Sequence, residues 1–180
     1  MLKDQELLKL LLSDKTKEKG FSILVGTYKE RLYWHIRNMV KSHDDADDVL
    51  QNTFVKIFKN LSHFKGESKL YSWMYRIATN EAITFINRRS RFMQISNEEV
   101  LELAVNNLEA DPYFEGDAAS LKLQKAVATL PERQQLVFNM KYFQELKYKD
   151  ISDILDTSEG ALKASYHLAV KKIEAYLKTN

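Results

Sequence analysis

Residues 158–173, with the sequence SEGALKASYHLAVKKI, place cations and hydrogen-bonding groups at helical spacing. At about 100° per residue, Ala164, His167 and Lys171 fall on one side of a helix, opposite an apolar stripe. Such side chains can bond to base edges and neutralise phosphates, which is the chemistry of nucleic-acid binding. The stretch contains no arginine, the residue that makes the commonest specific contact with a base.

This polar face requires a second element to hold its helix in place. The apolar stripe comprises Leu162, Tyr166, Ala169 and Ile173. A shorter helical pattern over residues 148–155 precedes it, and Asp156, which tolerates a left-handed backbone, falls in the turn between them. Ser158 can cap the longer helix. The spacing is that of a helix-turn-helix, although a helical hairpin within a bundle would show the same pattern.

The other apolar patterns in the chain are also helical. Stripes with helical spacing run from Phe21 to about Val40, from Leu50 to Leu61 and from Tyr71 to Ile86, and no strand-like alternation of any length occurs. The chain of 180 residues contains only 5 Gly and 2 Pro, so most of it can stay helical. We therefore predict an all-α fold of two small helical domains.

The charge distribution gives the predicted boundaries. Residues 1–91 have a net charge of +6, residues 92–119 a net charge of −7 without any Lys or Arg, and residues 120–180 a net charge of +3. We predict an N-terminal domain over 1–91, an acidic linker over 92–119 with at most short helical pieces, and a helix-turn-helix domain over 120–180. Two basic blocks are compatible with a nucleic-acid partner.

Several classes of protein find no support in the sequence. There is no cysteine, so no disulfide, thiolate nucleophile or Cys-based zinc site can form, which suits the cytoplasm. The Leu-rich N-terminal stretch contains charges and lacks a cleavage site, so it is not predicted to be a signal peptide. With no Gly-rich phosphate loop and no His pair at metal spacing, we expect no enzyme activity, cofactor or metal. Glu145 and the other isolated acids are interpreted as surface charges.

Two groups of motifs resemble the sigma-70 family of transcription initiation factors. The sequences DADDVLQNTF (45–54), FKGES (64–68) and YSWMYRIATN (71–80) are similar to region 2 of that family. The sequences LPER (130–133), YKDISDI (148–154) and SEGALK (158–163) are similar to region 4. Their order and the short chain resemble the extracytoplasmic-function (ECF) subgroup. The resemblance implies a sigma factor that binds core RNA polymerase, recognises the minus-ten and minus-thirty-five promoter elements and assists DNA melting.

The resemblance assigns polymerase binding to an acidic helix face. The residues implied are Asp45, Asp48, Gln51 and Asn52. Asn52 stands where the family often has Glu, so one charged contact differs. Acidic residues at a helix start are also favourable for the helix dipole alone, and that explanation stays open for some of the cluster.

A loop and a cationic helix are implied to bind the minus-ten element. The residues are Phe64, Lys65, Gly66, Glu67, Ser68, Lys69, Tyr71, Arg76, Asn80, Arg88, Arg89 and Arg91. In the family the loop captures a base flipped out of the duplex, and we expect nearby aromatic rings to stack on unpaired bases. Trp73 and Tyr75 fit a buried core equally well, and the arginines also fit a solvated helix end.

The helix-turn-helix is implied to bind the minus-thirty-five element. The residues are Lys141, Tyr148, Lys149, Ser158, Gly160, Ala161, Lys163, Ala164, Ser165, His167 and Lys171. Ser165 stands where arginine is frequent in the family. Because alanines can contact thymine methyls and lysines hold phosphates without specifying sequence, we predict an A·T-leaning element.

The expected partners follow from the same resemblance. They are core RNA polymerase, promoter DNA and an anti-sigma factor, with no small-molecule substrate. The resemblance implies a cytoplasmic protein, which an anti-sigma factor could hold at the inner membrane. A free-standing helix-turn-helix regulator is the alternative, and it leaves the acidic face and the base-capture loop unexplained. A protein-binding helical adaptor without a nucleic-acid role is a second alternative.

Overall fold

The computed structural model describes residues 4–64, 66, 68–108 and 116–179. All regular elements in these ranges are helical, which confirms the predicted all-α class. None of the helices found there combines the length and apolar character that crossing a membrane would require.

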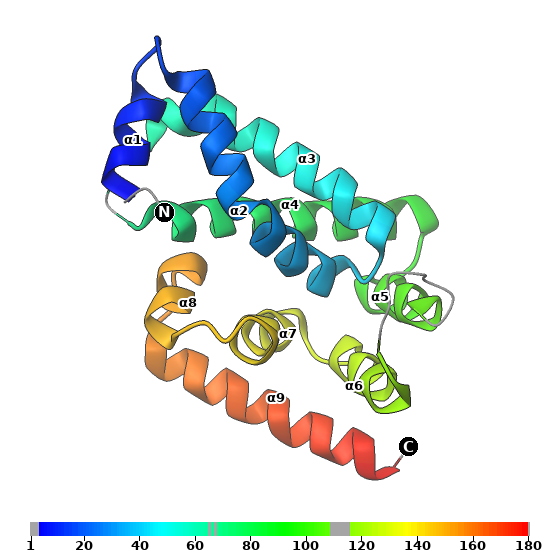
Figure 1. The fold of residues 1–180 in the computed structure, drawn as a ribbon. Coiled ribbons are helices and arrows are strands. Elements are labelled where there is room, and N and C mark those ends of the chain that lie inside the picture. Colours follow the sequence, from blue (N-terminus) through cyan, green and yellow to red (C-terminus); the bar gives the residue numbers. More distant parts are fainter. Residues whose placement is uncertain (1–3, 65, 67, 109–115, 180) are drawn as a thin grey trace.

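The N-terminal half is a bundle of helices (Figure 1). Apolar side chains are buried between these helices. Its elements are α1 (Asp4–Leu12), α2 (Lys17–Val40), α3 (His43–Asn60), the short 3₁₀ turn η1 (Leu61–His63) and α4 (Leu70–Met93). Leu32, Ile57 and Met74 are fully buried where α2, α3 and α4 meet. Helix α1 packs closely on α2, where a Cβ on Gly20 would lie 3.0 Å from the backbone of Leu10. The apolar stripes of the sequence therefore face a common core.

The C-terminal half contains the helix-turn-helix. Its elements are α6 (Ala118–Ala128), α7 (Glu132–Phe138), the π-helical segment η3 (Asn139–Phe143), α8 (Tyr148–Leu155) and α9 (Glu159–Thr179). Phe138 lies at the centre of a second apolar cluster that includes Ala169 and Ile173 of α9. The Phe138 ring stacks on the Tyr166 ring with a centroid distance of 5.8 Å. These contacts hold α9 against α6 and α7.

The acidic segment contains a regular helix, α5 (Asn97–Asn106). Ser96 and Glu99 form a reciprocal capping box, in which the Ser96 Oγ accepts from the Glu99 N–H at 3.1 Å. Val100, Leu101 and Val105 are buried, and α5 packs against both α4 and α6. The segment thus contains more helix than its composition predicts, because one capped turn and three apolar residues suffice to fold it.

The two halves pack on one another as two layers (Figure 1). Helix α8 lies beside α4, and η3 contacts α2. One hydrophobic cluster includes Leu24 and Met74 from the first half together with Met140, Ile151 and Leu162 from the second. The predicted helical units are therefore in contact in this structure, an arrangement that the sequence pattern does not predict.

Candidate nucleic-acid interface

The acidic face lies at the start of α3. Ser42 caps this helix, and its Oγ accepts from the Asp45 N–H at 3.4 Å. The Asp45 carboxylate pairs with Arg89 of α4 and is largely covered. Asp48, Gln51 and Asn52 are exposed. Of the predicted polymerase-binding residues, Asp48 is therefore the carboxylate that is open to a partner.

The predicted base-capture loop precedes α4. Phe64 is 9 % exposed, and its ring packs on the Trp73 ring with a centroid distance of 5.2 Å. Gly66 is exposed and has a φ of 74°, a conformation that favours glycine. Ser68 is half-buried, whereas Lys65 and Glu67 lie outside the described residues. The Phe64 side chain is therefore buried against Trp73 and is not open to a base.

The aromatic residues of α4 divide between core and surface. Tyr75 is 4 % exposed and packs with its ring 4.8 Å from that of His35, so it belongs to the core. Tyr71 is half-buried, with its ring 5.7 Å from the Tyr75 ring. Trp73 is half-buried behind Phe64. Tyr71 and Trp73 are therefore the rings of this group that remain partly exposed for stacking on a base.

The polar residues of α4 do not all share one face. Measured from Arg76, Asn80 and Arg91 lie within about 60° around the helix, whereas Arg88 lies at about 120° and Arg89 at about 220°. Arg89 turns toward α3, where it pairs with Asp45. Asn80, Arg88 and Arg91 are exposed. The helix therefore brings Arg76, Asn80 and Arg91 to one side of α4, with Arg88 farther round, and turns Arg89 away from them.

Two of these residues contact α8 of the other half. Arg76 donates from Nε to the carbonyl oxygen of Ile154 at 3.2 Å and from Nη2 to that of Asp153. The Lys69 Nζ lies 2.8 Å from the Asp150 Oδ1. The Asp150 side chain is only 13 % exposed, so the interpretation of isolated acids as surface charges is wrong for Asp150. Burial alone would raise the pKa of Asp150, but the Lys69 ammonium helps to hold it below its usual range.

The helix-turn-helix has the local geometry that the sequence predicts. Asp156 is left-handed, with φ 50° and ψ 52°. Ser158 accepts from the Ala161 N–H at 3.3 Å, which satisfies one free donor of α9. Leu162, Ala169 and Ile173 are buried and Tyr166 is half-buried, as expected for the inner stripe.

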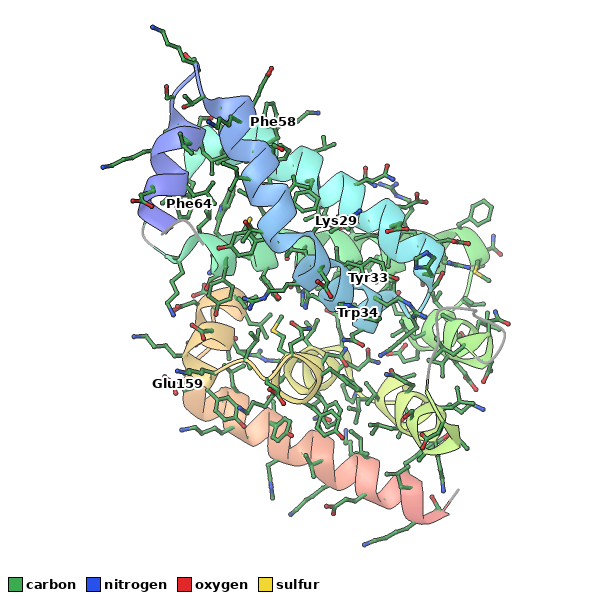
Figure 2. The ribbon with its side chains drawn as sticks, in the orientation of Figure 1. Lys29, Tyr33, Trp34, Phe58, Phe64 and Glu159 are labelled. Atoms are coloured by element: carbon green, nitrogen blue, oxygen red, sulfur yellow. The ribbon has the colours of Figure 1, made fainter. Side chains whose placement is uncertain are left out.

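The outer face of α9 is open to solvent. Gly160, Ala161, Lys163, Ala164, His167 and Lys171 are exposed, and Ser165 is half-buried. The Tyr148 ring sits between two cations, with the Lys141 Nζ at 5.2 Å and the Lys163 Nζ at 5.6 Å from its centroid. These contacts draw both ammonium groups together at the start of α9. Figure 2 shows Glu159 at this end of α9, below α8 in the view.

Three buried polar residues between the halves went unnoticed in the sequence. His35 bonds Thr79 at 2.8 Å and Gln144 at 2.9 Å, Lys41 donates to the Gln124 Oε1 at 2.7 Å, and the Asn139 Nδ2 donates to the Asn38 carbonyl at 3.1 Å. Their spacing gives no signal, because each bonds a residue that is distant in the sequence.

These features together define an all-helical protein in two parts. A bundle with an acidic helix and a cationic helix is joined, through an acidic segment, to a helix-turn-helix whose reading face is exposed. The family model for sigma-70 region 2 matches residues 24–92, and that for sigma-70 region 4 matches residues 120–173.

Curated relatives match over most of their length. The ECF RNA polymerase sigma-E factor of Haemophilus influenzae is 28 % identical over 167 residues, which cover 87 % of this chain and 87 % of the relative. The ECF RNA polymerase sigma factor SigW of Bacillus subtilis is 28 % identical over 162 residues, covering 85 % and 86 %. The chain belongs to the sigma-70 family of sigma factors, in its ECF subgroup.

Solved structures share the fold across both halves. The structure of CnrH in complex with the cytosolic domain of CnrY matches with a TM-score of 0.72 at 20 % identity and covers 98 % of each chain. The sigma factor RpoE in complex with the anti-sigma factor NepR from Bartonella quintana matches with a TM-score of 0.67 at 20 % identity, covering 90 % of this chain and 99 % of that one.

Proposed function

We propose that this sigma factor acts by positioning core RNA polymerase on promoter DNA and performs no catalytic chemistry itself. Asp48, Gln51 and Asn52 bind polymerase, with Asp45 supporting the same helix end through Arg89. The loop before α4 and the outer side of α4 bind the minus-ten element, and the outer face of α9 binds the minus-thirty-five element. The setting is the cytoplasm, where an anti-sigma factor is a further partner.

The observation that carries the polymerase assignment is the exposed carboxylate of Asp48. It lies on the side of α3 away from the bundle core, next to two exposed amides, Gln51 and Asn52. An exposed carboxylate at this position suits a cationic surface on a protein partner, because charge complementarity directs association.

The side chains on the outer face of α9, which would discriminate only weakly between bases, are consistent with this role. Lysine and alanine side chains at the reading face provide less discrimination than bidentate arginines. A regulator that binds DNA alone would depend on them entirely. A sigma factor is held at two promoter elements on one complex, so that each contact adds to the other.

The first test is binding to bacterial core RNA polymerase, measured by size-exclusion chromatography. We expect the wild-type chain to co-elute with polymerase and Asp48→Lys to lose co-elution. Glu174→Lys, the same charge reversal at an exposed position on α9, is the matched control and should still co-elute. If the wild-type chain fails to bind a cognate polymerase, or if both variants bind equally, the polymerase assignment to α3 is wrong.

A further inference from the structure

We propose that a cavity beside α5 binds a small organic cation with a short apolar body, of the class of primary alkylammonium ions. The cavity lies where α5 and α7 meet the later turns of α2 and α4. Of the described residues assigned above to polymerase or promoter DNA, none lines it. A ligand at this site would therefore be additional to the proposed partners.

The wall of the cavity is largely apolar and encloses a small space. Its apolar lining consists of Met39, Ile83, Ile86, Leu101, Leu130 and Leu136. The volume is about 50 Å³. Because one water requires about 10–15 Å³ of such space, the cavity has room for about four non-hydrogen atoms. A short alkyl chain is the part of a ligand that this wall would bury.

The buried polar groups of the cavity are hydrogen-bond acceptors. Asn139 is 1 % exposed, and its Nδ2 donates to the Asn38 carbonyl, while its Oδ1 has no partner among the described residues. Gln135 is 6 % exposed, and its Nε2 donates to the carbonyls of Ala128 and Leu130 at 3.0 and 3.2 Å. Because both amide nitrogens face backbone carbonyls, the two side-chain oxygens are the atoms left to meet a ligand. A ligand that satisfies them must donate.

Two carboxylates complete the lining. Glu98 lies in the first turn of α5 and Glu132 is the first residue of α7, and both are exposed. The described residues that line the cavity include no Lys, Arg or His. Acceptors and carboxylates around one space, without a cation among them, favour a positively charged donor and disfavour an anion. An ammonium group at the open side, with its alkyl chain inside, fits both the charge and the wall.

The probe for this site is n-butylammonium chloride, whose four carbons match the space inside. Methyl NMR of the chain labelled at the isoleucine δ1 positions observes the cavity directly, because Ile83 and Ile86 line it. Ile57, which is fully buried between α2, α3 and α4, is the internal reference. We expect the Ile83 and Ile86 signals to shift and to saturate with a Kd on the order of 1 mM, as suits so small a ligand. Sodium butyrate, which carries the opposite charge, should leave both signals in place.

Substitutions of the lining separate the contribution of charge from that of space. Glu98→Gln with Glu132→Gln removes both charges at nearly constant size and should raise the Kd about tenfold, as expected for two exposed ion pairs. Glu145→Gln with Glu174→Gln changes the net charge equally at exposed positions outside the cavity and should leave the Kd unchanged. Ile83→Phe fills the cavity and should abolish the shift of Ile86.

The possible results discriminate clearly. Ile83 and Ile86 signals that stay in place, or that move no more than that of Ile57, at about 50 mM n-butylammonium would show that the cavity is not a binding site. Equal shifts with butyrate would overturn the choice of a cation. An unchanged Kd in the Glu98→Gln, Glu132→Gln variant would overturn the role of the carboxylates. None of these results alters co-elution with polymerase, so the proposed function is tested separately.

Discussion

At the scale of single residues, Lys41 shows how the second half of the chain alters the chemistry of the first. It follows α2 with φ 63°, and its side chain is buried beneath α6 and η3. Burial, and then the Arg37 guanidinium, lower the pKa of Lys41 to about 7. An ammonium group in this setting is costly, because a neutral amide and an aromatic ring replace its water.

The buried lysine predicts a stability that rises with pH. The unfolded chain keeps the Lys41 proton up to about pH 10.5, whereas the folded chain releases it near pH 7. In that window the unfolded state binds more protons, so the unfolding free energy should rise by up to about 1.4 kcal/mol per pH unit. Urea unfolding of wild type and Lys41→Met between pH 7 and 10 measures the difference. Equal slopes in the two proteins would contradict a displaced Lys41 pKa.

At the scale of elements, the local rules of the sequence account for the reading helix and its turn. The left-handed Asp156, the Ser158 cap and the buried stripe of α9 all follow from spacing and residue type. The 3.6-residue period also indicates the long helices α2, α3 and α4. Spacing does not predict which charged side chains pair with one another across different helices. Asp150 and Arg89 stand at positions where the sequence pattern predicts a solvent-exposed side chain. Each nevertheless forms an ion pair with a residue distant in the sequence, Lys69 and Asp45 respectively.

The predicted roles of the α9 side chains can be separated by their effect on sequence preference. His167→Ala removes a group assigned to a base edge, so preference at one or two positions should relax by about 1–3 kcal/mol. Lys171→Ala removes a predicted phosphate contact. It should lower the affinity for all sequences alike and reduce the slope of log affinity against log salt concentration by about one.

Transcription by the holoenzyme from a library randomised at the minus-thirty-five element measures the sequence preference, and holoenzyme binding to one promoter at several salt concentrations measures the salt slope. The sequences that the wild-type protein selects should be rich in A·T pairs. If His167→Ala, Ser165→Ala and wild type select the same sequences, the assignment of these side chains to base edges is wrong.

At the scale of the whole molecule, the shared cluster ties two functional halves into one folded body. Met140 and Ile151 of the second half pack in the same hydrophobic cluster as Leu24 and Met74 of the first. Each half therefore covers apolar side chains of the other. Arg76 and Lys69 add polar contacts with α8 to the same interface between the halves. We therefore expect the free chain to unfold as one cooperative unit.

Both tryptophans, Trp34 and Trp73, lie in the N-terminal half, which makes cooperativity measurable. Tryptophan fluorescence reports on that half alone, whereas circular dichroism at 222 nm reports on helices throughout the chain. We expect coincident urea midpoints in the wild type and separated midpoints in Asp150→Lys. Separate midpoints already in the wild type would show that the contacts between the two halves contribute little to the free energy of unfolding.

Helix α9 is anchored at its C-terminal end, far from most of the residues proposed to contact DNA. Its 21 residues extend over about 32 Å, and its last turns are anchored through Tyr176, Leu177 and the Lys122 bond to the Leu177 carbonyl. A tilt of about 5° at that anchor would move the opposite end by about 3 Å, the length of one hydrogen bond. We therefore expect residues at the C-terminal end of α9 to influence which promoters are read without contacting a base.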